Sequence, residues 1–201
     1  MFSLIAAAGW PIWFLILASI LAVALIVERY LSLKRTKILP PRLLDEVLSL
    51  RQSEQISPEM LQRLERNSPL GRVLATGLRY ERAPRAVMKE SMEEAGRSVA
   101  HELEKYVGAI GTIASIAPLM GLFGTVIGMI EIFGAQAPSG TNPQQLAHGI
   151  SVALYNTAFG LVIAIPAMIA YRVYRARVDD FLVEMEQQSL RLIDSLGGGR
   201  P

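Results

Sequence analysis

The chain has 201 residues and no cysteine. Disulfides, thiolate metal ligands and cysteine nucleophiles are therefore excluded. Its two histidines, His101 and His148, are far apart in the sequence and do not suggest a metal pair. The sequence also has no G-x-S-x-G motif and no phosphate-binding glycine loop ahead of a lysine. These absences argue against an enzyme, and we expect no cofactor, no bound metal and no nucleic acid partner.

Charged side chains are missing from three long stretches: Met1 to Val27, Tyr106 to Ile130 and Ile132 to Tyr171. A helix needs about 20 mostly apolar residues to cross the core of a bilayer. We therefore predict membrane-spanning helices over residues 10–28, 109–132 and 149–171. The rest of the chain is too short to cover three such helices in a soluble protein, so the expected fold class is an all-α integral membrane protein. No strand pattern competes with this interpretation.

Basic residues cluster on one side of the three predicted spans. None stands before the first span or between the second and third, and those that flank the spans elsewhere are Lys34, Arg35, Lys37, Arg42, Arg97, Lys105, Arg172, Arg175 and Arg177. The positive-inside rule then places residues 1–9 and the loop 133–148 in the periplasm, and residues 29–108 and 172–201 in the cytoplasm. A cleaved signal peptide carries its positive charge before the apolar core. Here the charge follows the core, so we expect an uncleaved anchor.

Helix signals fill the predicted cytoplasmic segments. Ser57-Pro58 and Ser68-Pro69 each indicate a capping serine with proline at the first helical position. Apolar residues recur at spacings of three and four and predict one continuous helix over 84–133: Val87, Met88, Met92, Ala95, Val99 and Leu103. A similar stripe carries the third span on to Gly197: Val178, Phe181, Leu182, Met185, Leu192 and Leu196. Spans two and three would then extend into a cytoplasmic helical stalk. The alternative for the last segment, a helix lying on lipid, is disfavoured by its acidic residues.

Small residues form one stripe on each of the last two spans. At helical spacing these stripes are Pro118, Gly121, Thr125 and Gly128, and Ala153, Thr157, Gly160, Ala164 and Ala167. Small side chains let helix backbones approach closely in lipid. Each stripe also holds one threonine. Spacing alone leaves two interpretations open: close packing with each threonine bonded to its own i−4 carbonyl, or hydroxyls that face a pore.

Two segments carry a resemblance to a known family. G-L-F-G-T-V-I-G-M-I (121–130) and G-I-S-V-A-L-Y-N-T-A-F-G-L-V-I-A-I-P-A (149–167) resemble the ExbB/TolQ/MotA family of proton-channel subunits, and three spans fit its ExbB and TolQ branch. The resemblance implies a homopentamer in the bacterial inner membrane, with a dimer of an ExbD- or TolR-like single-span protein in its pore. It also implies that proton flow turns one component relative to the other and drives a TonB- or TolA-like effector.

The same resemblance implies roles for residues of both inner spans. A proton path would be lined by Thr125 and Thr157, together with Ser151, Val152 and Asn156. A face that packs against the helices of the partner would consist of Pro118, Gly121, Gly128, Ala153, Gly160 and Ala164.

One position departs from the family pattern. ExbB and TolQ have a glutamate within G-I-A-E-A-L, whereas residues 149–154 of this chain read G-I-S-V-A-L, with Val152 in its place. The inner spans then hold no carboxylate near the middle of the membrane, since Glu131 lies one turn from the outer end of the second span. A hydroxyl cannot store a proton, so we expect the titrating carboxylate to come from the partner. A sodium-driven relative and a non-conducting membrane scaffold are the alternatives.

Overall fold

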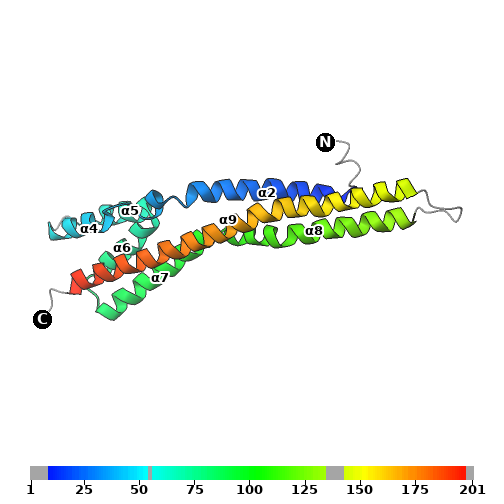
Figure 1. The fold of residues 1–201 in the computed structure, drawn as a ribbon. Coiled ribbons are helices and arrows are strands. Elements are labelled where there is room, and N and C mark those ends of the chain that lie inside the picture. Colours follow the sequence, from blue (N-terminus) through cyan, green and yellow to red (C-terminus); the bar gives the residue numbers. More distant parts are fainter. Residues whose placement is uncertain (1–8, 54–55, 135–142, 198–201) are drawn as a thin grey trace. The chain divides into compact units, whose positions relative to one another are not determined.

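The computed structural model describes residues 9–53, 56–134 and 143–197, the side chains of Gln145, His148 and Val152 excepted. Within these residues the chain forms eight helices and no strand (Figure 1). The chain divides into two compact units. The first comprises residues 1–29 and 106–173, and the second residues 30–105 and 174–201.

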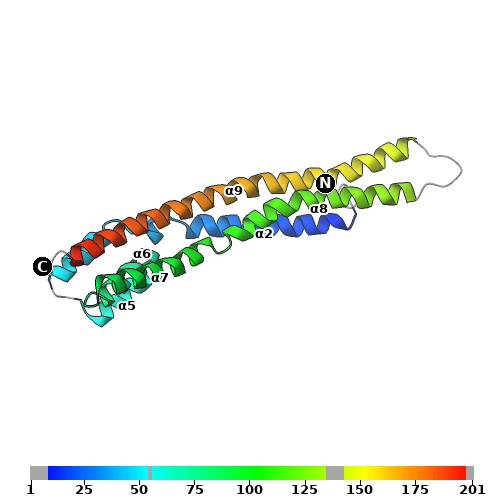
Figure 2. The same cartoon turned by 90° about the horizontal axis from the view of Figure 1, so that it is seen from below.

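The first unit contains three helices that are long and apolar enough to cross a membrane, which is the number predicted. They are α2 (Pro11–Ser32), α8 (Val107–Gly134) and the first half of α9 (Pro143–Gly197). Figures 1 and 2 both show α8 and this half of α9 side by side along their lengths. The helix α2 packs on this pair through a buried apolar cluster made of Leu15, Ala22, Ala117, Ile163 and Ala164.

Two ring contacts set the register of α2 along α8. At one end the rings of Trp10 and Phe123 meet edge to face with centroids 6.1 Å apart. At the other end the guanidinium of Arg29 lies 5.3 Å from the ring centroid of Tyr106. Tyr106 and Phe123 are 17 positions apart in the sequence, which corresponds to about 25 Å at 1.5 Å per residue, close to the thickness of a hydrocarbon core. Residues 124–134 of α8 therefore lie past the first turn of α2.

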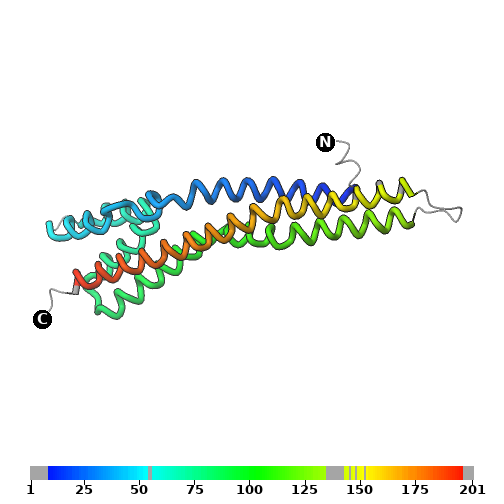
Figure 3. The backbone as a smooth tube through the Cα atoms, in the orientation of Figure 1, coloured from blue at the N-terminus to red at the C-terminus, as the bar shows by residue number. Residues whose placement is uncertain are grey.

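The second unit is built from short helices and the last part of α9. The short helices are α3 (Arg35–Ile38), α4 (Leu43–Gln52), α5 (Pro58–Asn67), α6 (Pro69–Arg79) and α7 (Arg85–Glu104), and Figure 3 traces α4 to α6 in cyan. The two predicted helix starts are confirmed. Ser57 Oγ accepts a hydrogen bond from the backbone N–H of Met60, and Ser68 Oγ accepts one from that of Gly71. Each bond satisfies one of the free N–H groups at a helix start.

Predicted apolar stripes form the core of the second unit. The buried members are Met88, Met92, Val99 and Leu103 on α7, and Val178, Phe181, Met185, Leu192 and Leu196 on α9. Val87, which was also predicted in the stripe of α7, is 41% exposed and lies outside the core. The 3.6-residue period thus placed most of the buried side chains of these two helices.

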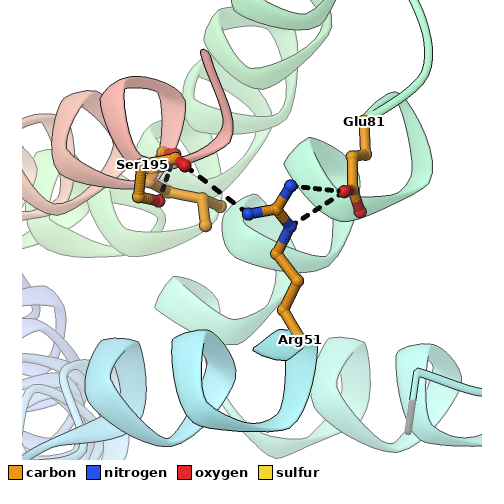
Figure 4. A network of polar contacts seen from close by, with 4 residues as sticks. Arg51, Glu81 and Ser195 are labelled. Atoms are coloured by element: carbon orange, nitrogen blue, oxygen red, sulfur yellow. Dashed lines mark hydrogen bonds and ion pairs between the residues drawn. The ribbon is translucent and has the colours of Figure 1, made fainter. Parts of the chain in front are cut away.

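A polar network joins α4 to the end of α9 within the second unit (Figure 4). The guanidinium of Arg51 donates two hydrogen bonds of 2.8 Å to Glu81 and contacts the backbone oxygen of Ser195 at 3.5 Å. The side chains of Arg51 and Glu81 are about one-third exposed. A pair of this exposure contributes about 0–1 kcal/mol, so it orients the helix ends more than it stabilises the unit.

The prediction of a continuous helix over 84–133 is wrong. The helix α7 ends at Glu104 and α8 begins at Val107, and Figure 2 shows the interruption between them. Tyr106 has φ +67°, in the left-handed region. That conformation costs a residue with a side chain about 1–2 kcal/mol. The contact with Arg29, a buried residue that also pairs with Glu28, offsets part of this cost.

Candidate functional site

The two threonines of the inner spans meet across the contact between α8 and α9. The hydroxyl oxygens of Thr125 and Thr157 are 2.6 Å apart. Thr125 Oγ1 also lies 3.0 Å from the backbone oxygen of Ala153 and 3.2 Å from that of Gly121. Each hydroxyl has one proton to donate. Each proton is used once if Thr157 donates to Thr125 and Thr125 donates to one of the two carbonyls. The contact between the helices therefore forms whether Thr125 donates to Gly121 of its own helix or to Ala153 of α9.

Two glycines allow the backbones of α8 and α9 to touch at this level. A Cβ atom on Gly121 would lie 2.6 Å from the backbone oxygen of Asn156 and 3.0 Å from the Cα of Thr157. A Cβ atom on Gly160 would lie 2.6 Å from the backbone oxygen of Ala117. Backbone atoms cannot rotate away as the end of a side chain can. Glycine at these positions therefore sets the helix separation that brings the two hydroxyls into contact.

Asn156 lies beside the threonine pair in the same helix contact. Its side chain is buried, with 1% of its surface exposed. A Cβ atom on Gly124 would lie 2.8 Å from its Cγ, so Gly124 leaves the space that the amide occupies. Polar side chains that are buried between membrane helices stabilise the contact by roughly 1 kcal/mol and fix the helix register.

The contacts described for the residues expected to pack against a partner are all with other residues of this chain. Gly121 and Gly160 face the opposite backbone, and Gly128 approaches Ala153, with 3.3 Å between its added Cβ and the Cβ of Ala153. Ala164 belongs to the cluster beneath α2, and Pro118 is half-buried on α8. A role of any of these six residues toward a second protein stays a prediction.

Ser151, another residue of the predicted proton path, is not part of the threonine contact. Ser151 is exposed, and its hydroxyl donates to the backbone oxygen of Ala147 at 2.9 Å. It lies six residues before Thr157 and so points about 120° away around α9. The side chain of Val152 lies outside the described residues.

The threonine pair lies where α2 does not cover α8 and α9. Ile113 and Met120 of α8 pack against the cluster beneath α2. Thr125 follows them by 12 and 5 residues, which places it about 120° and 140° further around the helix. Thr157 precedes Ile163 of that cluster by six residues, about 120° around α9, but precedes Ala164 of the same cluster by seven residues, only about 20°, so on α9 it lies at the edge of the face that α2 meets. Because Thr125 follows Phe123, which meets Trp10 at the start of α2, the helix α2 does not cover the hydroxyl pair.

The chemistry of this site is limited to hydrogen bonding. Among the described residues no group of three or more histidine, aspartate or glutamate side chains could hold a metal ion. Glu131, the acid nearest to Thr125 in α8, is exposed and lies six residues away. Hydroxyls can pass a proton along hydrogen bonds or hold a water molecule.

Comparisons with known proteins point to one family. The sequence model of the MotA/TolQ/ExbB proton channel family matches residues 65–187. The ExbB-like 3 protein of Synechocystis sp. is 31% identical over 163 residues, which cover 79% of this chain and 77% of the relative. The Tol-Pal system protein TolQ of Haemophilus influenzae is 41% identical over 103 residues, 48% of this chain and 44% of TolQ. The biopolymer transport protein ExbB of Pseudomonas putida is 37% identical over 117 residues, 52% of this chain and 35% of the relative.

Proposed function

The chain belongs to the MotA/TolQ/ExbB proton channel family, and we propose that it is the stator subunit of a proton-driven motor in the bacterial inner membrane. Members of this family are channel and transport components with membrane-spanning helices. The proposed work is mechanical: proton flow through a complex with an ExbD- or TolR-like partner drives an effector of the TonB or TolA kind. The proposed assembly is a homopentamer around the partner, with the N-terminus in the periplasm and the C-terminus in the cytoplasm.

The observation that carries this proposal is the threonine pair on the flank that α2 leaves open. Five copies with this flank turned inward would surround a pore with a ring of paired hydroxyls. The 2.6 Å contact orients the pair, and the carbonyl of Ala153 or Gly121 accepts the hydrogen bond that Thr125 donates. The hydroxyl oxygens keep lone pairs that can accept a hydrogen bond from water or from a carboxyl group. An uncharged wall of this kind suits a moving partner, because no fixed acid of the wall holds the partner in place.

Because the inner spans of this chain contain no acid near the middle of the membrane, the partner has to provide one. Charged groups within a bilayer are costly and rare, and where they occur they mark ion pathways. The stretches 106–130 and 132–171 carry no charged side chain. The proposed partner therefore contributes a carboxylate, an aspartate or glutamate, in a single span that passes the level of Thr125 and Thr157.

The first test is purification of the full chain from its native membrane and identification of what accompanies it. We expect a protein with one N-terminal span that carries a carboxylate. Replacement of that carboxylate by its amide should abolish proton flux and leave the complex intact. A complex without a membrane-embedded acid in either protein would contradict the proposal.

The second test removes one hydroxyl of the pair. Thr157→Val keeps the shape of the side chain and should retain the complex while motor-dependent function is lost. The matched control is Thr76→Val in α6, where the hydroxyl is also bonded to an i−4 carbonyl, that of Arg72 at 3.0 Å, outside the predicted spans. Thr76→Val should leave function unchanged. Normal function in Thr157→Val would favour a non-conducting scaffold in which the small residues serve packing alone.

A further inference from the structure

A second polar feature lies on the first unit, nearer to the end of α8 at which Tyr106 stands. It is an open hollow of about 380 Å³ between α8 and α9, whose lining includes Gly108, Gly111, Thr112, Ser115, Met168 and Tyr171. The cluster beneath α2 does not include any of these residues. The hollow is therefore a feature of the α8–α9 pair itself.

Two exposed hydroxyls line this hollow. Thr112 donates to the backbone oxygen of Gly108 at 3.0 Å, and Ser115 donates to that of Gly111 at 2.9 Å. Their protons are used within α8, while both oxygens keep lone pairs that face the hollow. These hydroxyls thus mark a surface that accepts hydrogen bonds.

Glycine and tyrosine give the hollow its shape. A Cβ atom on Gly111 would lie 2.9 Å from the ring of Tyr171, so this glycine lets the ring rest on α8 and close one wall. A Cβ atom on Gly108 would have no neighbour within 4 Å, so that position is open. The result is a recess with one aromatic wall and a rim of hydroxyls.

The hollow and the threonine pair lie at different levels along α8 and α9. Gly111 lies 14 residues before Thr125, and Tyr171 lies 14 residues after Thr157. On a regular helix this places each about 40° from its threonine and about 21 Å along the axis. Ser115 and Thr112 lie 10 and 13 residues before Thr125, about 80° and 140° from it around α8. Residues 116–124 of α8, between Ser115 and Thr125, carry no polar side chain. The hollow and the threonine pair are therefore two separate hydroxyl-lined places along the α8–α9 pair, with an apolar segment between them.

We propose that this hollow is the hydrated inner end of the ion path, in which water held by Thr112 and Ser115 takes up protons that have passed the level of the threonine pair and hands them on to the cytoplasm. This inference rests on the proposed function, because it assumes that the flank with the threonine pair faces the pore. It assigns Thr112, Ser115 and Tyr171 a role that the family motifs did not. The hydroxyl oxygens accept hydrogen bonds from the water, and Tyr171 bounds its space.

The absence of cysteine from the chain makes a direct test possible. Ser115→Cys and Thr112→Cys each place one thiol in the hollow of an otherwise thiol-free protein. The matched control is Ile169→Cys, because Ile169 is 59% exposed but lies two residues before Tyr171 and so about 160° away around α9. The probe is a charged, membrane-impermeant methanethiosulfonate added to inverted membrane vesicles that hold the full complex.

A thiol reacts with this probe as the thiolate, which forms only where water reaches it. We expect the thiols at 112 and 115 to be labelled about tenfold or more faster than the thiol at 169. Labelling at 115 should also block proton flux, because the attached charge occupies the recess. Equal, slow labelling at all three positions would overturn the inference and indicate that a helix fills the hollow.

The outcome separates this inference from the proposed function. If the hollow is unreactive while Thr157→Val abolishes proton flux, the hydrated inner end is wrong and the proton-driven motor stands. If positions 112 and 115 react while Thr157→Val conducts normally, the hollow is hydrated and the role of the threonine pair in the path is wrong.

Discussion

Substitution of Gly121 by alanine tests the helix contact on which the site depends. The new Cβ would lie 2.6 Å from the backbone oxygen of Asn156 and 3.0 Å from the Cα of Thr157, whereas ordinary contacts begin at 3.4 Å. Because both neighbours are backbone atoms, α9 must move away by about 0.8 Å at this level, the difference between 3.4 and 2.6 Å. Forced overpacking of this kind costs about 1–3 kcal/mol.

The same displacement acts on the hydroxyl pair. If the 2.6 Å separation of Thr125 and Thr157 grows by the same amount, it reaches about 3.4 Å, past the range of a good O–H···O bond. We therefore expect Gly121→Ala to lower both the melting temperature of the purified complex in detergent and its proton flux in liposomes. The loss of flux should exceed that of a variant with an equal loss of stability elsewhere in the chain.

A matched glycine provides the control for this substitution. Gly96 lies inside α7, and a Cβ atom there would have no neighbour within 4 Å. Gly96→Ala should stabilise the protein by about 0.5–1 kcal/mol, since alanine loses less backbone entropy in a helix. Unchanged melting temperature and unchanged flux in Gly121→Ala would refute the backbone contact between α8 and α9.

Two further predictions concern residues that stabilise the fold. Tyr106→Ala should destabilise the complex by about 0.5–2 kcal/mol, because it loses the ring that contacts Arg29 while residue 106 stays in the left-handed region. Tyr106→Gly should be about 1 kcal/mol more stable than Tyr106→Ala, because glycine adopts that region without strain. Equal melting temperatures of the two variants would show that the backbone there is unstrained. Ser68→Ala should lower the free energy of unfolding by about 0.5–2 kcal/mol, because it removes the buried cap of α6. Thermal unfolding measures this loss, and Ser57→Ala, which removes an exposed cap, should lower the free energy of unfolding by less. A larger loss in Ser57→Ala would contradict this.

Local signals in the sequence predicted much of the architecture. The uncharged stretches gave the number of spans, because a bilayer imposes length and polarity on any helix that crosses it. The capping serines at 57 and 68 were recognised because their partners lie three residues away in the chain. The stripes of small residues predicted close helix contacts, since the spacing of a helix is regular.

The features that escaped prediction depend on residues distant in the sequence. The interruption at Tyr106 is supported by Arg29, which lies 77 residues earlier, and no glycine or proline marks the site. The neighbours of the small residues also could not be read from spacing, because a small-residue face suits a helix of the same chain as well as one of a partner. The 2.6 Å contact of the threonines needed the coordinates of both helices.

The most direct test of the central claim is proton flux through the co-purified complex in liposomes, compared between the natural chain and Thr157→Val. An imposed proton gradient should drive flux through the natural complex, and an imposed sodium gradient should not. Thr157→Val should reduce proton flux to the level of empty liposomes while the complex remains assembled. Undiminished proton flux in that variant, or transport of sodium instead, would contradict a proton path along the threonine pair.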